Sequence, residues 1–282
     1  MPTTEIRGAH INYEIVGDTG PWIALSPGGH RGMAELRSLA QRLADAGNRV
    51  LLHDRRNCGA SDVVVDDTQP EYQIWADDLH ALLQQLGVDS AWIGGSSSGC
   101  RLSLTYALRH PETVRGLLLW RVTGGDWATR RLAEMYYGTF AKIAAEGGME
   151  AICATEHFSG LISERPENRD KLMAMNADWF VAAMEAWRDG FLAELGNPVL
   201  GFTAEQLKSV TVPAIVIPGN DNTHNRESGE LAESLLPNSE LYVLYADHED
   251  VDLVPPADWL PKEGEMADAF LDFMRAHDPE VH

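Results

Sequence analysis

The sequence predicts an α/β fold, with a mostly parallel sheet of the eight-stranded type, helices on both faces and a helical cap insertion. Two observations indicate this fold. Short apolar runs alternate with longer amphipathic segments, which is typical of strands joined by crossover helices. The alternation then stops after Trp120 and resumes at Val212, and the interval between them reads as helices without a clear core strand.

The expected elements follow from the spacing of the apolar residues. Two short segments at the start, residues 5–7 and 11–15, predict an antiparallel edge of the sheet. Buried strands are expected at 22–25, 49–52, 91–93, 114–120, 214–217 and 241–244. Helices are expected at about 34–46, 71–87, 99–110, 227–236 and 264–275.

The helical interval divides the chain into two parts. Residues 1–125 and 206–282 are expected to form an α/β core, and residues 126–205 a helical cap. The chain has 282 residues, of which 44% are hydrophobic, and this is enough to bury a substantial core.

The composition also bears on the cellular location of the protein and on whether it binds a cofactor. The sequence has no run of 18 apolar residues, and its first residues lack the basic lead and apolar run of a secretory signal. Its three cysteines, an odd and small number, argue against a disulfide framework and lack zinc-site spacing. These features favour a cytoplasmic protein with no metal site, and no motif for a cofactor is present.

The formal net charge of −21 limits the partners. Such a charge repels nucleic acid and anionic membranes, so neither is expected to bind. A small-molecule substrate is the expected partner. The oligomeric state stays open, with a homo-oligomer as one alternative.

A motif for nucleophilic catalysis follows the expected strand at 91–93. Residues 94–99 read Gly-Gly-Ser-Ser-Ser-Gly, and G-x-S-x-G fits only with Ser97 at its centre, between Gly95 and Gly99. Between a strand and a helix, this pattern forms a tight, strained turn that exposes the serine hydroxyl. The glycines are needed because the strand and the helix approach closely there. The sequence therefore predicts Ser97 as a nucleophile.

Here the chain resembles the α/β-hydrolases that use a serine nucleophile. The similarity includes the helix after Ser97, through residues 106–111, and the run His-Asp-Arg-Arg-Asn-Cys-Gly-Ala-Ser-Asp at 53–62. It extends over nearly the whole chain. The resemblance implies a hydrolase whose triad follows the chain order Ser, acid, His.

That order implies a general base after the last strand. His248 follows the expected strand at 241–244 and is the predicted base. Its expected task is to take the proton of Ser97 and later to activate water.

The acid is expected after the strand at 214–217, where residues 218–224 read Pro-Gly-Asn-Asp-Asn-Thr-His. Many relatives carry the acid three residues after the glycine, which here is Asn222. Some carry a shorter G-x-D-x-x-H turn, which this sequence matches, so Asp221 is the predicted acid. Asp126, at the end of the preceding strand, is the alternative.

Two N–H groups are expected to hold the oxyanion. One is that of Ser98, which follows the nucleophile. The other lies in the loop after the strand at 22–25, where Pro27 replaces the histidine of the usual His-Gly pattern, and Gly29 is the predicted donor. Apolar bulk in the cap predicts an apolar pocket for a medium-sized substrate. The candidate substrate contacts are His30, Trp127, Tyr136 and Phe158.

The predicted function is hydrolysis of an ester, lactone or thioester of a medium-sized, mostly apolar molecule through a Ser-His-Asp triad and an acyl-enzyme. Three alternatives remain. One is an aminopeptidase similar to proline iminopeptidases, with cap carboxylates such as Glu134, Glu146, Glu150 or Glu156 holding the free amino group. Another is a carbon–carbon bond hydrolase with the same triad. The last is a non-hydrolytic binding protein on this fold.

Overall fold

An eight-stranded sheet, in the order β1-β2-β4-β3-β5-β6-β7-β8, is the centre of the computed structural model, which describes residues 2–278. β1 and β2 pair antiparallel to each other, and β2 also runs antiparallel to β4, while the remaining neighbours are parallel. The strands are β1 (Thr3–Ile6), β2 (Ala9–Val16), β3 (Trp22–Ser26), β4 (Arg49–His53), β5 (Ala91–Ser96), β6 (Val114–Trp120), β7 (Ala214–Ile217) and β8 (Ser239–Leu241). The expected mostly parallel sheet with an antiparallel edge is confirmed.

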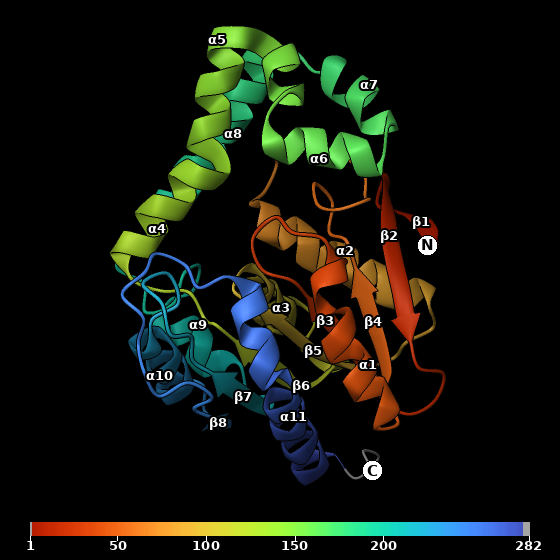
Figure 1. Ribbon diagram of the computed structural model, residues 1–282, viewed down its shortest axis with the longest axis vertical. Coiled ribbons are helices and arrows are strands. Elements are labelled where there is room, and N and C mark those ends of the chain that lie inside the picture. The colour runs from red at the N-terminus through yellow and green to blue at the C-terminus, as the bar shows by residue number, and fades with distance from the viewer. Residues whose placement is uncertain (1, 279–282) are drawn as a thin grey trace.

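Helices cover both faces of the sheet (Figure 1). The helices of the core are α1 (Arg37–Asp45), α2 (Glu71–Gln85), α3 (Ser98–Arg109), α9 (Ala204–Ser209), α10 (Arg226–Leu235) and α11 (Glu263–His277). Helices α1 and α11 pack on one face, and α2, α3, α9 and α10 on the other. The alternation along β6 shows the two faces, because Leu117 and Leu119 belong to one core cluster and Leu118 and Trp120 to the other.

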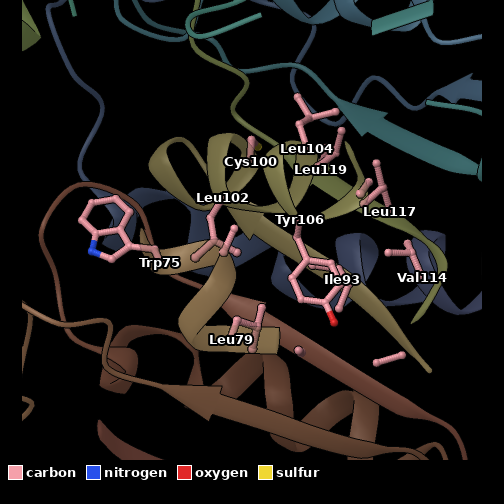
Figure 2. Packing of buried hydrophobic residues seen from close by; sticks show 14 of the residues in the cluster. Trp75, Leu79, Ile93, Cys100, Leu102, Leu104, Tyr106, Val114, Leu117 and Leu119 are labelled. Atoms are coloured by element: carbon pink, nitrogen blue, oxygen red, sulfur yellow. The ribbon is translucent and has the colours of Figure 1, made fainter. Parts of the chain in front are cut away.

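Figure 2 shows the packing on the α2–α3 side. Trp75 and Leu79 from α2 and Leu102 and Tyr106 from α3 meet Ile93 of β5. All five side chains are almost fully buried. This packing fixes α3, and with it the turn at the end of β5, against the sheet.

Between β6 and β7 the chain forms a separate layer of helices, which stands above the carboxyl ends of the strands in Figure 1. Its elements are α4 (Asp126–Ala133), the π-helical segment η3 (Glu134–Gly138), α5 (Thr139–Cys153), α6 (Glu156–Glu164), α7 (Glu167–Met173) and α8 (Ala177–Leu192). They bury an apolar cluster of their own, which includes Phe180, Met184 and Trp187. We call α4 to α8 the cap helices.

The last strand differs from expectation. β8 covers only Ser239–Leu241, whereas the sequence predicts a strand at 241–244. After one further bond from Tyr242 N–H to the Val216 carbonyl (3.0 Å), the chain leaves the sheet edge. Leu244 then packs into the apolar cluster that contains Val254 and Trp259. This residue of the expected strand is therefore buried in the core without being part of the sheet. Three short turns of helix complete the described chain: η1 (Met33–Leu36), η2 (Pro111–Thr113) and η4 (Pro256–Lys262).

Within residues 2–278, no helix combines the length and the apolar character needed to cross a membrane.

Candidate active site

Ser97 lies at the sharp turn between β5 and α3. Its backbone is in the left-handed region, with φ 54° and ψ −110°, which is uncommon for a residue with a side chain. A Cβ at Gly95 would come within 2.5 Å of the Gly99 carbonyl carbon, and a Cβ at Gly99 within 2.2 Å of the Ser26 oxygen. Both positions therefore require glycine, because a side chain there would clash with the backbone of the closely packed strand and helix.

The Ser97 hydroxyl contacts a histidine that in turn contacts a carboxylate. Nε2 of His224 lies 2.8 Å from Oγ of Ser97, and Nδ1 of His224 lies 2.9 Å from Oδ1 of Asp221. His224 and Asp221 both belong to the turn that follows β7 and both are buried. Nucleophile, base and acid in this order of contact form the arrangement of a Ser-His-Asp triad.

The sequence predicts His248 beside Ser97, and this prediction is wrong. The histidine that contacts Ser97 is His224. His248 is exposed and its Nε2 lies 3.0 Å from Oδ1 of Asn222. The physical reason is that β8 ends at Leu241, and the chain after it runs past the outside of the turn that carries His224. The sequence did contain a signal for His224, because it is the last residue of the G-x-D-x-x-H turn.

The turn after β7 is braced from two sides. The segment 249–254 pairs with it: Asn222 N–H donates to the Val251 carbonyl (2.9 Å), and Val254 N–H donates to Oδ2 of Asp221 (3.0 Å). Inside the turn, the His224 N–H donates to Oδ1 of Asp221 (2.8 Å). The acid therefore has several donors that fix its carboxylate.

Arg121, which follows β6, is a buried partner of the acid that sequence analysis missed. Its Nη2 donates to Oδ2 of Asp221 at 2.8 Å and to the Val254 carbonyl at 2.6 Å, and it lies 3.4 Å from Nδ1 of His224. The guanidinium stands over the Trp259 ring at 5.2 Å. Like Ser97, Arg121 has a positive φ, here 56°. Nothing in the sequence separates it from a surface arginine at a strand end.

Burial and these contacts set the protonation of the acid and the base. Burial alone would raise the pKa of Asp221, but hydrogen bonds from His224 and Val254 and the charges of His224 and Arg121 lower it overall. Burial lowers the pKa of His224, the Asp221 hydrogen bond opposes this, and the charge of Arg121 lowers it further. The acid is therefore ionised and the imidazole is neutral at neutral pH, as a general base requires.

A cavity of about 620 Å³ opens at Ser97 and His224, between the strand ends and the cap helices. Its lining includes Gly29 and His30 from the loop after β3 and Tyr136 and Phe140 from the cap helices. A smaller cavity of about 20 Å³ also adjoins Ser97 and is lined by Ser98 and Tyr136 as well. Among residues 2–278, no group of three His, Cys, Asp or Glu side chains could hold a metal ion.

Comparisons with known proteins agree with this geometry. Residues 21–129, which contain the Ser97 turn, match the family described as alpha/beta hydrolase fold. The enol-lactonase from Burkholderia xenovorans superposes with a TM-score of 0.65 at 18% identity, covering 97% of this chain and all (100%) of that one. The chain has the alpha/beta-hydrolase fold, and its residues 21–129 match the family of that description. The predicted family and fold are confirmed, and the comparisons support the expectation of a hydrolase.

Two sequence relatives of this hydrolase cover different shares of it. The uncharacterized hydrolase YraK from Bacillus subtilis is 32% identical over 116 residues, which is 41% of this chain and 42% of YraK. The proline iminopeptidase of Lactobacillus delbrueckii subsp. bulgaricus is 24% identical over 226 residues, covering 73% of this chain and 75% of that protein.

The two residues expected to hold the oxyanion line cavities that Ser97 also lines, Gly29 the large one and Ser98 the small one. Ser98 is the first residue of α3, and a helix start leaves its first N–H groups free of helical acceptors. Gly29 has a positive φ of 52°, and a Cβ there would lie 3.5 Å from the Tyr136 hydroxyl, so this hydroxyl stands over the loop. The loop keeps its shape without the usual histidine, because Arg55 donates to the Gly29 carbonyl (2.6 Å) and Gly28 N–H to Glu35 (3.3 Å).

The expected substrate contacts divide into two groups. His30 and Tyr136 line the 620 Å³ cavity. Trp127 is not among its lining residues and is 47% exposed, because α4 turns it to the surface beside Arg131. Phe158 is buried in the cap cluster with Phe180, at 6.1 Å between ring centroids, and is not among the residues lining this cavity either.

The alternative acid, Asp126, lies away from the base. It is exposed at the start of α4, and its Oδ1 accepts a hydrogen bond from Gly196 N–H (2.9 Å). The described contacts of His224 involve Asp221 and not Asp126. The geometry therefore favours Asp221 among the two carboxylates.

Proposed function

We propose that the protein is a serine hydrolase that cleaves an ester, lactone or thioester of a medium-sized, mostly apolar small molecule. Ser97, His224 and Asp221 form its triad, and the reaction passes through an acyl-enzyme. The observation that carries the proposal is the pair of contacts of His224, 2.8 Å to the Ser97 hydroxyl and 2.9 Å to Asp221.

The proposed first half-reaction is acylation. Oγ of Ser97 attacks the carbonyl carbon while its proton passes to Nε2 of His224, and Asp221 stabilises the imidazolium through Nδ1–H. The negative oxygen of the tetrahedral intermediate accepts hydrogen bonds from the N–H groups of Ser98 and Gly29. When the intermediate collapses, the bond to the leaving group breaks and His224 returns the proton to that group.

Deacylation repeats these steps with water. His224 takes a proton from the water as its oxygen attacks the acyl carbon, and the resulting oxyanion uses the same N–H groups. The bond between the acyl carbon and Oγ then breaks. His224 returns the proton to Ser97, which restores the free enzyme and releases the carboxylic acid.

The cavity supports a substrate of moderate size. Its volume of about 620 Å³ lies in the range of ~300–1,000 Å³ that is typical of small-molecule sites. Apolar side chains such as Phe140, Ile143 and Leu253 supply much of its lining, and Thr139 and His157 add polar groups. Burial and the neighbouring His30 lower the pKa of His157 to about 4, so it is a neutral polar group at neutral pH.

An aminopeptidase is the second candidate, and the similarity to a proline iminopeptidase favours it. Such an enzyme needs a carboxylate near the nucleophile for the free amino group. Glu156 lines the 620 Å³ cavity, whereas Glu134 pairs with Lys142 (2.9 Å) and Glu150 with Arg169 (3.0 Å) on the cap surface. A single carboxylate at the cavity gives this candidate less support than the ester hydrolase.

A substrate panel tests the proposal. Short and long acyl esters, lactones, thioesters, aminoacyl amides and a carbon–carbon cleavage substrate are assayed with the wild type and Ser97→Ala. We expect turnover of at least one ester, lactone or thioester and a loss of about 10⁶-fold in kcat in the variant. A fluorophosphonate probe should label the wild type at Ser97. Exclusive cleavage of aminoacyl amides would favour the aminopeptidase, and absence of labelling in folded protein would contradict both hydrolases.

A further inference from the structure

The hydroxyl of Ser97 has a second hydrogen-bond partner besides His224. Oγ1 of Thr123 lies 3.2 Å from Oγ of Ser97, and both residues are buried. Within the described part of the chain, the Thr123 hydroxyl has no other hydrogen-bond partner. This hydroxyl therefore contacts the attacking atom itself, although it does not belong to the proposed triad.

The chain after β6 holds Thr123 in this place. Thr123 lies three residues beyond the end of β6, the strand that pairs with β5, and its carbonyl accepts the N–H of Leu200 (3.0 Å). The carbonyl of Trp120, the last residue of β6, accepts the N–H of Ser97 (3.2 Å). The same stretch of chain thus contacts Ser97 at its backbone through Trp120 and at its hydroxyl through Thr123.

The contacts of His224 decide which of the two hydroxyls donates. Nδ1 of His224 lies 2.9 Å from the ionised carboxylate of Asp221, which can only accept, so Nδ1 carries a proton. Burial lowers the pKa of His224, so the ring is neutral and its Nε2 is an acceptor. Ser97 therefore donates its proton to Nε2, which lies 2.8 Å away. In the remaining contact, Thr123 is the donor and Oγ of Ser97 is the acceptor.

The strength of this hydrogen bond changes as Oγ passes through the proposed reaction. In the free enzyme Oγ belongs to a hydroxyl, which accepts a hydrogen bond well. In the acyl-enzyme Oγ is the bridging oxygen of an ester, and it accepts poorly because it shares a lone pair with the carbonyl group. This sharing ends when water adds to the carbonyl carbon. As the bond from that carbon to Oγ breaks, negative charge develops on Oγ, and hydrogen bonds to charged oxygen are the stronger ones.

We propose that Thr123 is a further catalytic residue, whose hydroxyl donates to Oγ of Ser97 and speeds the departure of this oxygen from the acyl-enzyme. This inference rests on the proposed hydrolase function. Only an interaction that is stronger in the transition state than in the state before it raises a rate. Deacylation begins with the poorly accepting ester oxygen and gains from the bond, whereas acylation begins with the hydroxyl and gains little. In the breaking step, the electron pair of the carbon–oxygen bond goes to Oγ, the proton comes from His224, and Thr123 keeps its own proton.

A variant of nearly the same shape tests the inference. Thr123→Val replaces the hydroxyl by a methyl group, and the substrate is whichever of p-nitrophenyl acetate, butyrate and octanoate the wild type cleaves fastest. Stopped-flow measurement of p-nitrophenolate gives the acylation rate from the burst and the deacylation rate from the steady state. We expect acylation close to the wild-type rate and deacylation about 10–100-fold slower, which is the effect of one hydrogen bond to a charged group.

The steady-state constants and the mass of the enzyme give independent readouts. When deacylation alone is slowed, kcat and KM fall together and kcat/KM, which reports acylation, stays at the wild-type level. Mass spectrometry of Thr123→Val quenched during turnover should show Ser97 carrying the acyl group. A merely structural role of Thr123 would instead lower kcat/KM and leave no acylated enzyme.

Further variants separate the hydroxyl from packing. Thr123→Ser keeps the hydroxyl without the methyl group and should deacylate at close to the wild-type rate. Thr105→Val removes another buried threonine hydroxyl, which lies on α3 and donates to the Arg101 carbonyl (2.8 Å), and both rates should stay at the wild-type level. If Thr123→Val does not fold, the pair Thr123→Ala and Thr123→Ser, which differ only in the hydroxyl, provides the comparison.

Three results would overturn the inference: equal slowing of acylation and deacylation in Thr123→Val, unchanged rates in that variant, or slow deacylation in Thr123→Ser. In each case, ester cleavage by the wild type and its labelling by the fluorophosphonate probe would leave the proposed hydrolase intact. Absence of both cleavage and labelling in folded wild-type protein would refute the hydrolase, and the role of Thr123 with it.

Discussion

Asp221 and His224 are three residues apart in one turn, and Oδ1 of the carboxylate accepts both the backbone N–H of His224 (2.8 Å) and its Nδ1–H (2.9 Å). A single local structure therefore positions both the proposed acid and the proposed base. This structure lies at the carboxyl end of β7, two strands from β5, whose end carries Ser97. The sheet brings this turn next to Ser97. The contacts between Asp221 and His224 form within the turn itself.

Replacing the two histidines separately tests which one is the base. His224→Ala should lower kcat by about 10⁶-fold on a p-nitrophenyl ester, because the proton of Ser97 then has no acceptor. His248→Ala removes an exposed side chain that hydrogen-bonds Asn222, so kcat should stay within about threefold, as for surface substitutions. The reverse order of effects would restore His248 as the base.

The two candidate acids are compared in the same way. Asp221→Asn should lower kcat by about 10⁴-fold, since the amide favours the wrong tautomer of the imidazole. Asp126→Asn changes an exposed residue at the start of α4 and should leave kcat unchanged. Circular dichroism of both variants checks that the fold is retained. A loss confined to Asp126→Asn would contradict the assignment of Asp221.

Arg121 should control the pH dependence of the reaction. A general base acts unprotonated, so kcat/KM falls as the pH drops through the pKa of His224, which lies below the ordinary 6.5. The charge of Arg121 contributes to that lowering, so in Arg121→Met the acid limb of the pH profile should move to higher pH. An unchanged limb would show that Arg121 has only a structural role.

The same variant should also be less stable. Removing Arg121 leaves the buried Asp221 carboxylate without its cationic partner, and breaking such a pair costs about 3–5 kcal/mol. Urea unfolding at pH 7.5 measures the change in the free energy of unfolding. Arg109→Met, which removes the partner of Asp77 near the surface, is the control. Loss of stability with the pH profile intact would separate the packing role of Arg121 from its electrostatic role.

The glycines of the Ser97 turn should tolerate no side chain. Gly99→Ala would bring a Cβ within 2.2 Å of the Ser26 oxygen, so we expect a loss of about 3 kcal/mol in the free energy of unfolding. Gly160→Ala, in the middle of α6, meets nothing within 4 Å and should stabilise the protein by about 0.5–1 kcal/mol. Thermal unfolding of both variants gives the comparison, and similar midpoints would contradict the close approach at Gly99.

The fold and the place of Ser97 on its turn were predictable because local patterns determine them. Buried strands such as β5 and β6 are continuous apolar runs, and Gly95 and Gly99 leave a single register for Ser97. His248 was expected beside Ser97 because the family order was applied to the end of β8, while the nearer D-x-x-H turn was used only for the acid. The structure instead places His224 beside Ser97. Contacts between distant segments, such as those of Arg101 with Tyr72 and Phe191, have no signature in a single sequence.

The backbone of residues 249–254 hydrogen-bonds the turn after β7, and the backbone of the residues just before them does not. The two neighbouring stretches should therefore differ in how well they tolerate a break or an insertion in the chain. Glu249 N–H donates to the Asn220 carbonyl (2.7 Å), and from there to Val254 the backbone supports the acid and the base. Residues 245–248 come just before this stretch, and from Ala246 to His248 they are exposed. We therefore expect the protein to tolerate new chain termini made by circular permutation, or an inserted reporter domain, between Ala246 and Asp247. The same operation five residues later would break the hydrogen bonds that hold the proposed triad residues Asp221 and His224 in place.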